Sequence, residues 1–212
     1  MLDKYNYIAI EGPIGVGKTS LAQRLSDHLG AQTLLEKPEE NPFLARFYQD
    51  PLRNALPTQL FFLFQRSNEV RDLAQRDLFQ TRTITDYLFD KDRLFARINL
   101  SDEEFSLYQN IYASLAPQAP APDLVIYLQA PVEKLVERVR RRAHAHERAI
   151  SDFYLTRLAQ AYSDFFHHYD AAPVLVINSE HLNFVDNEDD FSLLLQRINE
   201  MRGPREFFSM GA

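Results

Sequence analysis

The chain has 212 residues, a formal net charge of −7 and no cysteine. This length predicts one domain over residues 1–212, and the lack of cysteine excludes disulfide bonds, thiolate zinc sites and cysteine nucleophiles. The acidic balance argues against nucleic acid as a partner, because binding a polyanion needs a broad basic surface. No apolar run is long enough to cross a bilayer, so we expect a cytoplasmic protein that does not bind membranes.

Short apolar runs along the chain predict five buried strands separated by helical stretches. This order predicts an α/β fold of three layers, in which a parallel five-stranded sheet is flanked by helices on both faces. Among the helices, Pro57 is expected to open a long one, and Ser101 with Glu104 forms a capping box ahead of another. The predicted strands are Tyr5–Ile10, Gln32–Leu35, Thr81–Thr85, Asp123–Leu128 and Val174–Ile177.

The second half of the chain adds four predicted segments. The proline-rich stretch 116–122 is expected to form a stiff surface loop, and a long helix is expected over about Ser151–Tyr169. Acidic residues at 186–190 suit the start of the last helix, where negative charge is favourable. The end of the chain, Arg202–Ala212, contains glycine, proline and small residues and is expected to be frayed.

A phosphate-binding loop follows the first predicted strand and leads into a helix over Ser20–Leu29. Its glycines let successive backbone N–H groups turn towards phosphate oxygens, and the helix start adds the positive end of its dipole. Lys18 is expected to reach the outer phosphates of ATP, and the Thr19 hydroxyl to coordinate Mg²⁺. A glycine-rich turn used only for packing is the alternative. The predicted nucleotide-binding residues are Gly12, Pro13, Ile14, Gly15, Val16, Gly17, Lys18, Thr19 and Ser20.

Glu36 stands directly after the second predicted strand. Because the carboxyl ends of neighbouring parallel strands line one crevice, Glu36 is expected near the point where a transferred phosphate leaves the loop. A carboxylate there can orient an acceptor hydroxyl and take its proton, whereas it would repel a phosphate acceptor. The alternative is a solvated glutamate in an acidic loop beside Glu39 and Glu40.

A predicted slot for a nucleobase lies on the long helix that follows. Gln59 and Arg66 are seven residues apart, about two helical turns, so they share a face with Phe62. Glutamine offers a donor and an acceptor to a base edge, and the aromatic ring offers a stacking surface. An ordinary amphipathic helix with solvated Gln59 and Arg66 is the alternative.

These motifs, in this order and spacing, resemble the deoxynucleoside kinases, particularly the bacterial deoxyadenosine/deoxyguanosine kinase branch. The likeness covers nearly the whole chain. It implies a P-loop kinase fold, an arginine-rich lid over about residues 138–150, and a homodimer. The residues that carry it are the Gly12–Thr19 loop, Glu36, Asn41-Pro42-Phe43-Leu44, Phe47-Tyr48, the Gln59–Arg66 stretch and the arginine-rich segment that ends at Glu147.

The resemblance implies roles around the acceptor. Glu36 would be the general base on the 5′-hydroxyl of the sugar, and Tyr48, eleven residues before Gln59, would bind the 3′-hydroxyl. In relatives that use purines, an arginine at the position of Arg66 works with an aspartate, here Asp90 or Asp92. A tyrosine such as Tyr48 could equally be a packing residue on residue type alone.

The resemblance also implies roles around the phosphates. Asp86 would reach Mg²⁺ through water. Tyr87 departs from the family pattern, because relatives usually carry an arginine at this position, and that arginine's function would move to Lys91 or Arg93.

The arginine-rich segment is expected to close over the donor. Arg138 and Arg142 lie four residues apart on one predicted helix face, so their guanidinium groups can neutralise charge on the transferred phosphoryl group. By resemblance, Glu147 would meet the 3′-hydroxyl of the sugar when the lid closes. A basic run taken alone is more often a solvated helix face.

The residues and the resemblance together predict an enzyme of nucleotide salvage. It would transfer the γ-phosphoryl group of magnesium ATP to the 5′-hydroxyl of a deoxynucleoside, with deoxyadenosine or deoxyguanosine favoured. One alternative is a thymidylate-type nucleoside monophosphate kinase, which needs arginines where Glu36 and Tyr48 stand. Another is a non-catalytic or slow nucleotide-binding switch, but the Asn-Lys-x-Asp stretch of GTPases does not occur.

Overall fold

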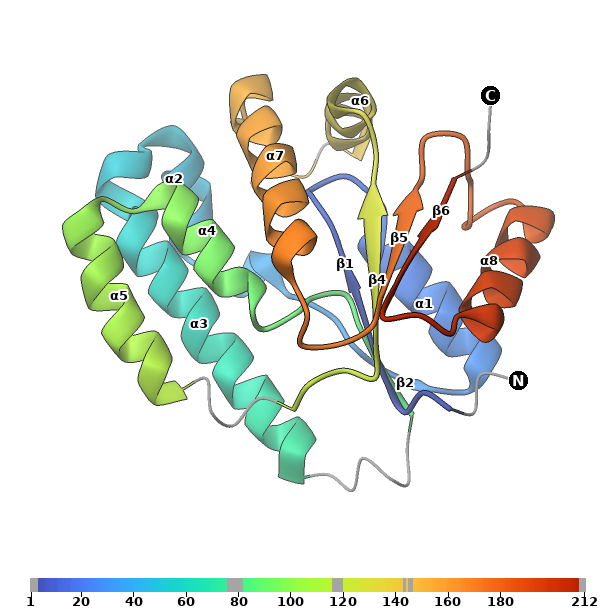
Figure 1. The fold of residues 1–212 in the computed structure, drawn as a ribbon. Helices are drawn as coiled ribbons and strands as arrows, with labels where there is room; N and C mark the ends of the chain where they lie inside the picture. Colours follow the sequence, from blue (N-terminus) through green and yellow to red (C-terminus); the bar gives the residue numbers. More distant parts are fainter. Residues whose placement is uncertain (1–3, 76–81, 116–119, 143, 145–146, 210–212) are drawn as a thin grey trace.

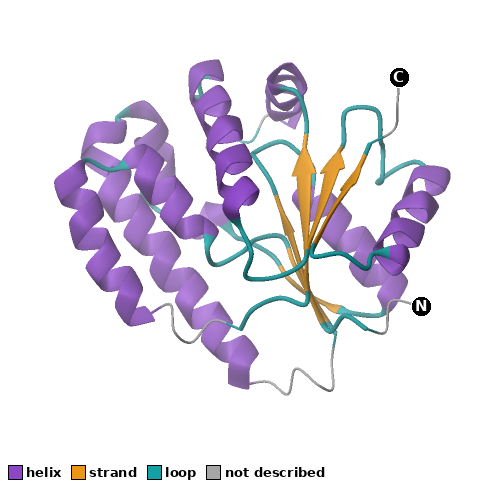
Figure 2. Cartoon of the chain, in the orientation of Figure 1, coloured by secondary structure: helices purple, strands orange, loops and turns teal. Residues whose placement is uncertain are grey.

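A parallel sheet of six strands forms the centre of the computed structural model, which describes residues 4–75, 82–115, 120–142, 144 and 147–209. The strand order is β2-β3-β1-β4-β5-β6, and helices cover both faces (Figures 1 and 2). The α/β prediction is therefore confirmed. The strands are β1 (Tyr7–Glu11), β2 (Gln32–Leu34), β3 (Thr83–Thr85), β4 (Leu124–Gln129), β5 (Val174–Asn178) and β6 (Arg205–Phe208).

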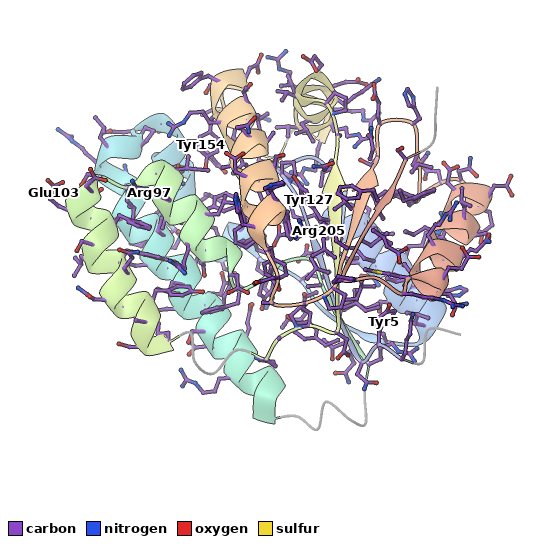
Figure 3. All side chains as sticks on the ribbon, viewed as in Figure 1. Tyr5, Arg97, Glu103, Tyr127, Tyr154 and Arg205 are labelled. Atoms are coloured by element: carbon purple, nitrogen blue, oxygen red, sulfur yellow. The ribbon has the colours of Figure 1, made fainter. Side chains whose placement is uncertain are left out.

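The sixth strand corrects the prediction of five strands and a frayed end. Arg205–Phe208 pairs in parallel with β5, and the Arg205 guanidinium, beside the end of α7 (Asp152–His168), donates to the carbonyls of His167 and Tyr169 (Figure 3). Phe208 is 7% exposed and Phe207 is 77% exposed. Only one of these adjacent rings enters the core, because side chains alternate between the two faces of a strand. In a strand of four residues this alternation is barely visible in the sequence. Residues 210–212, and Thr81 of the third predicted strand, lie outside the described residues.

The helices agree with the predicted order, with one correction at the long helix. The helix begins at Pro51, and Pro57 lies inside it. The fixed backbone angle of a proline suits the first helical position, and Pro51 rather than Pro57 occupies that position. The other helices are α1 (Lys18–Leu29), α2 (Leu44–Gln49), α4 (Lys91–Asn99), α5 (Asp102–Leu115), α6 (Val132–Arg142), α7 and α8 (Glu188–Glu200), with a short 3₁₀ turn η1 at Pro38–Glu40 and the long helix as α3 (Pro51–Gln75).

Predicted helix ends are confirmed at three places. Ser101 and Glu104 exchange side-chain and backbone hydrogen bonds ahead of α5. The Ser151 hydroxyl accepts the Tyr154 N–H at the start of α7. The acidic stretch does begin the last helix, where the Asn187 side chain caps it and acidic residues fill the first turn. No helix in the described ranges is both long and apolar enough to span a bilayer.

Alternation along the strands divides the core between the two faces of the sheet. Ile8 and Ile10 of β1 point into a cluster with α1 and α8, whereas Tyr7 and Ala9 point into a cluster with α4 and α7. A third cluster joins α2, α3, α4 and α5 beside the second one, around Leu63. The segments that follow β1, β2 and β3 lie on one side of a cavity whose other sides include α2, α3 and α4.

Candidate active site

The phosphate loop connects β1 to α1 and has the backbone that its glycines predict. Gly15 has φ +86° and Gly17 has φ +104°, a region that other residues rarely adopt. A Cβ at Gly15 would lie 2.9 Å from the Leu135 carbonyl oxygen and 2.8 Å from the Val139 side chain, so α6 packs directly on the loop. Glycine at position 15 is therefore needed both for conformation and for this close approach.

Lys18 and Thr19 are the first two residues of α1, directly after the loop. The Lys18 ammonium donates to the carbonyls of Gly12, at 2.8 Å, and Pro13, at 3.3 Å. Burial, together with the nearby charge of Lys91, lowers the pKa of Lys18. The Thr19 hydroxyl donates to Asp86, at the end of β3, over 2.5 Å.

A cavity of about 780 Å³ opens beside the loop and brings most of the predicted residues together. It extends from the loop to α3 and to the segment after α6. The predicted residues that line it are Ile14, Gly15, Gly17, Lys18, Thr19, Ser20, Glu36, Tyr48, Gln59, Phe62, Arg66, Asp86, Arg142 and Glu147. Gly12, Pro13, Val16, Asp92 and Arg138 do not line it.

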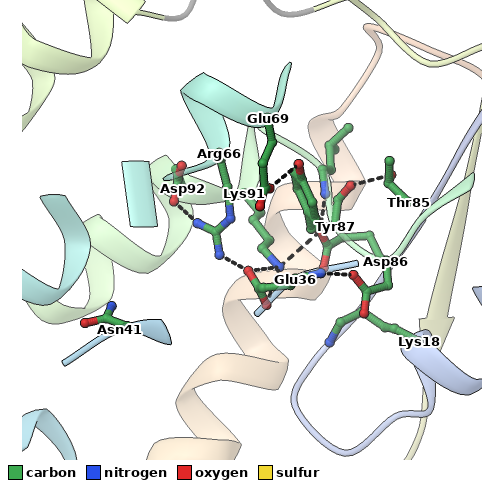
Figure 4. A network of polar contacts seen from close by, with 12 residues as sticks. Lys18, Glu36, Asn41, Arg66, Glu69, Thr85, Asp86, Tyr87, Lys91 and Asp92 are labelled. Carbon is green, nitrogen blue, oxygen red and sulfur yellow. Dashed lines mark hydrogen bonds and ion pairs between the residues drawn. The ribbon is translucent and has the colours of Figure 1, made fainter. Parts of the chain in front are cut away.

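Glu36 lies inside this cavity, which argues against the alternative of a solvated loop residue. Its backbone N–H donates to Asp86 over 2.7 Å. Its carboxylate pairs with Arg66 and lies 3.2 and 3.3 Å from the Lys91 ammonium (Figure 4). Burial alone would raise the pKa of Glu36, but these two cations hold it well below its usual range. Glu36 is therefore an ionised acceptor at neutral pH.

Arg66 is held from the other side by Asp92. Of the two candidate aspartates, Asp92 forms the ion pair, because it lies in the first turn of α4 and points inward (Figure 4). Asp92 is fully buried behind Arg66, so it orients the guanidinium and does not itself reach the cavity. Burial raises the pKa of Asp92 to about 6, although the charge of Arg66 opposes this shift. The Arg66 guanidinium also lies 4.9 Å from the centre of the Phe62 ring.

Three residues bear on the arginine that relatives usually carry at position 87. The Tyr87 phenol donates to Glu69 over 2.7 Å and does not line the cavity. Arg93 is exposed and lies over the Tyr112 ring. Lys91 is the residue of this stretch whose charge reaches Glu36 and the cavity.

The two predicted lid arginines separate. Arg142 pairs with Glu147, and both line the cavity. Arg138 instead donates to the carbonyls of Val16, at 3.3 Å, and Ser179, at 3.1 Å. Because α6 packs against the phosphate loop, Arg138 reaches the backbone of the loop at Val16. Arg138 therefore positions the loop and does not line the cavity.

Sequence reasoning missed Glu11 and two tyrosines of α7. Glu11 is fully buried at the end of β1 and accepts hydrogen bonds from the Gly12 and Leu88 backbone and from the Tyr162 hydroxyl. An acid that ends an apolar strand was the available signal. Tyr154 and Tyr162 line the cavity from one face of α7, and Tyr154 lies beside Tyr48, with ring centres 6.1 Å apart. Their eight-residue spacing places them on the same helix face.

The fold and the phosphate loop define a P-loop nucleotide-binding protein. The sequence model of the deoxynucleoside kinase family matches residues 8–202, and the chain belongs to that family. A deoxyguanosine kinase of Bacillus subtilis is 32% identical over 92% of this chain and 97% of its own length. A deoxyadenosine kinase of Lactobacillus acidophilus is 28% identical over 91% and 94%.

A solved structure confirms the fold. The deoxyadenosine kinase from M. mycoides with bound dATP superposes with a TM-score of 0.78 at 25% identity, covering 92% of this chain and 100% of that structure. The family resemblance stated from the sequence is therefore confirmed.

Proposed function

We propose that this protein transfers the γ-phosphoryl group of ATP to the 5′-hydroxyl of a deoxynucleoside in nucleotide salvage, with purine deoxynucleosides favoured. The observation that carries the proposal is the ionised Glu36 carboxylate, in the same cavity as Lys18 and Thr19 of the phosphate loop. A carboxylate there accepts a hydrogen bond from a hydroxyl, and it would repel the phosphate of a monophosphate acceptor.

The transfer follows from these positions. Glu36 accepts the 5′-hydroxyl hydrogen bond and takes the proton as the 5′-oxygen bonds to the γ-phosphorus. The bond from the γ-phosphorus to its bridging oxygen breaks, and the electron pair stays on ADP. Lys18, released from the carbonyls of its own loop, offers its charge to the phosphates, and Arg142 adds a guanidinium from the lid side.

Thr19 and Asp86 fit a magnesium ion at the phosphate end of the cavity. A hydroxyl and a carboxylate 2.5 Å apart supply the oxygen ligands that Mg²⁺ prefers, directly or through water. The described residues contain no cluster of three or more metal-binding side chains, which suits an ion held mainly by phosphates and water. When bound, the ion would neutralise charge on the phosphates.

The remaining lining residues provide the nucleoside site. Tyr48 and Glu147 are proposed to bind the 3′-hydroxyl, and Gln59, Phe62 and Arg66 the base. The paired Arg66 and Asp92 support a purine, because donors held in place by an acid suit its hydrogen-bonding edge. The names of the relatives, deoxyguanosine and deoxyadenosine kinases, also support this choice. The homodimer stays a prediction, testable by light scattering.

The proposal is tested by ADP release with a panel of deoxynucleosides and monophosphates, repeated with Glu36→Gln. We expect stimulation by deoxynucleosides, and a loss of about 10²- to 10⁴-fold in kcat with Glu36→Gln, because the amide accepts no proton. Glu40→Gln, an exposed residue of η1 that does not line the cavity, is the matched control and should leave kcat unchanged. Stimulation by monophosphates alone, or full activity of Glu36→Gln, would contradict the proposal.

A further inference from the structure

Lys91 is a buried cation at the start of α4. Its side chain is 2% exposed, and its ammonium lies between two carboxylates, Glu36 at 3.2 Å and Glu11 at 3.7 Å. The rings of Tyr87 and Phe95 lie about 6 Å from the nitrogen, at 5.8 and 5.9 Å. Burying an ammonium among aromatic rings costs free energy unless it is paired, so this lysine is held here by its two acids.

The two acids differ in what else holds them. Glu11 is enclosed by the protein and accepts two backbone N–H groups and the Tyr162 hydroxyl. Glu36 faces the cavity and is shared between Lys91 and Arg66. Lys91 therefore has one fixed partner behind it and one partner whose charge the reaction would change.

Carboxylates and cations alternate through the cavity wall in the order Glu11, Lys91, Glu36, Arg66, Asp92 (Figure 4 shows the last four). If Glu36 takes a proton, it no longer attracts either neighbour as an anion. Arg66 keeps Asp92, and Lys91 keeps Glu11. An ammonium has three donors, so Lys91 can then bind an anionic group in the cavity while Glu11 still holds it.

We propose that Lys91 is a catalytic residue of the phosphoryl transfer, whose ammonium passes from the Glu36 carboxylate to the oxygens of the arriving phosphoryl group. This step rests on the proposed function. The 5′-hydroxyl proton moves to Glu36, the new O–P bond forms at the 5′-oxygen, and ADP leaves with the electron pair. Lys91 exchanges no proton. It follows the negative charge from Glu36 to the product monophosphate and remains anchored by Glu11.

The first test is Lys91→Gln in the full-length protein. Glutamine can still donate to Glu36, so a purely structural contact survives while the charge is lost. We expect kcat to fall about 10²- to 10³-fold, as for loss of one donor to the transferred group. The affinity for the deoxynucleoside should hold, and the affinity for its 5′-monophosphate should fall, both measured by titration calorimetry. Lys134→Gln, an exposed lysine of α6, is the control and should change neither.

The split between kcat and the two affinities gives a readout that a structural role would not produce. Lys91 faces Glu36 together with two other cations, Lys18 of α1 and Arg66 of α3, and the Asp86 carboxylate accepts the Glu36 backbone N–H. Loss of a purely structural contact would weaken nucleoside and monophosphate binding alike. Equal loss of both affinities would therefore overturn the inference, as would an unchanged kcat.

A second test uses the unaltered protein and so decides the matter even if the variant does not fold. A crystal structure with ADP, aluminium fluoride and deoxyadenosine should place the Lys91 nitrogen in hydrogen-bonding distance of a fluoride. A nitrogen that stays on Glu36 would overturn the inference. If the unaltered protein phosphorylates deoxynucleosides while Lys91→Gln is fully active, only this inference fails. If the unaltered protein phosphorylates none, the proposed function fails.

Discussion

At the scale of single residues, the site is a set of buried charges whose neighbours push their pKa values apart. Two cations keep Glu36 ionised, whereas burial raises the pKa of Asp92 to about 6. Both acids contact the same guanidinium, that of Arg66. The difference arises because Glu36 also contacts Lys91, while Asp92 is fully enclosed and its Oδ2 oxygen has no hydrogen-bond partner among the residues that the structure describes.

Asp92 is therefore expected to make stability depend on pH. An aspartate titrates near 3.9 in the unfolded chain, so between about pH 4 and pH 6 the folded protein binds more protons than the unfolded one. The contribution of Asp92 to the free energy of unfolding falls as the pH rises through this window, by on the order of 2 kcal/mol, and is constant above it.

Asp92→Asn tests this expectation. The variant lacks the titrating group, so its free energy of unfolding should fall less than that of the parent between pH 4 and pH 6, as measured by urea denaturation. Asp102→Asn, with an exposed carboxylate, is the control and should retain the slope of the parent. Parallel curves for the parent and Asp92→Asn would show that Asp92 titrates at the same pH in the folded and unfolded states.

At the scale of secondary-structure elements, the proposed donor and acceptor halves of the site come from different packing units. The phosphate loop is fixed by α6, through Gly15 and the Arg138 side chain. The proposed nucleoside residues Tyr48, Gln59, Phe62 and Arg66 lie on α2 and α3, whose apolar sides take part in the third core cluster. The far edge of the sheet is completed by β6, none of whose residues lines the cavity.

The adjacent rings of β6 give a matched pair of variants. Phe208→Ala should reduce the free energy of unfolding by about 3 kcal/mol or more, because a buried phenylalanine is removed from the core. Phe207→Ala should change it by less than about 0.5 kcal/mol, because that ring is exposed. Chemical denaturation of both variants measures the difference. Equal effects would show that β6 does not pack on the sheet as described.

At the scale of the whole molecule, the cavity lies where chain segments distant in sequence meet. Lys18, Glu36, Arg66 and Lys91 come from α1, the end of β2, α3 and α4, and Glu147 follows α6. Buried charges destabilise the protein unless they are paired, and here the pairs Glu36–Arg66 and Glu36–Lys91 run between elements. A nucleotide and a nucleoside bound in this cavity would each add contacts that only the folded chain offers.

Ligand binding should therefore stabilise the fold in two separable steps. ADP or a deoxynucleoside at about 100 times its Kd should each add about 2.7 kcal/mol to the free energy of unfolding. For a chain of this size the Tm should rise by about 5 to 10 °C for each, as measured by calorimetry. Lys18→Ala should lose most of the shift with ADP and keep the shift with the nucleoside. A nucleoside shift lost in Lys18→Ala would contradict the separate positions assigned to the two ligands.

The sequence by itself determined the alternation of strands and helices, the phosphate loop and the position of Glu36. These features are local, because hydrophobic periodicity, glycine spacing and the end of a strand are written in neighbouring residues. The family resemblance supplied the residues proposed for the nucleoside site in the same way, through motifs of fixed spacing. One error, at Pro57, was also local, since a proline can stand inside a helix that another proline begins.

Only the tertiary structure decided which charges meet. Asp92 rather than Asp90 faces Arg66, Lys91 rather than Arg93 faces Glu36, and Arg138 faces the loop backbone. The burial of Glu11 and the addition of β6 to the sheet also depended on it. The physical reason is common to all of these: an ion pair or an edge strand forms between segments far apart in the chain, and its partner is chosen by packing that no local pattern contains.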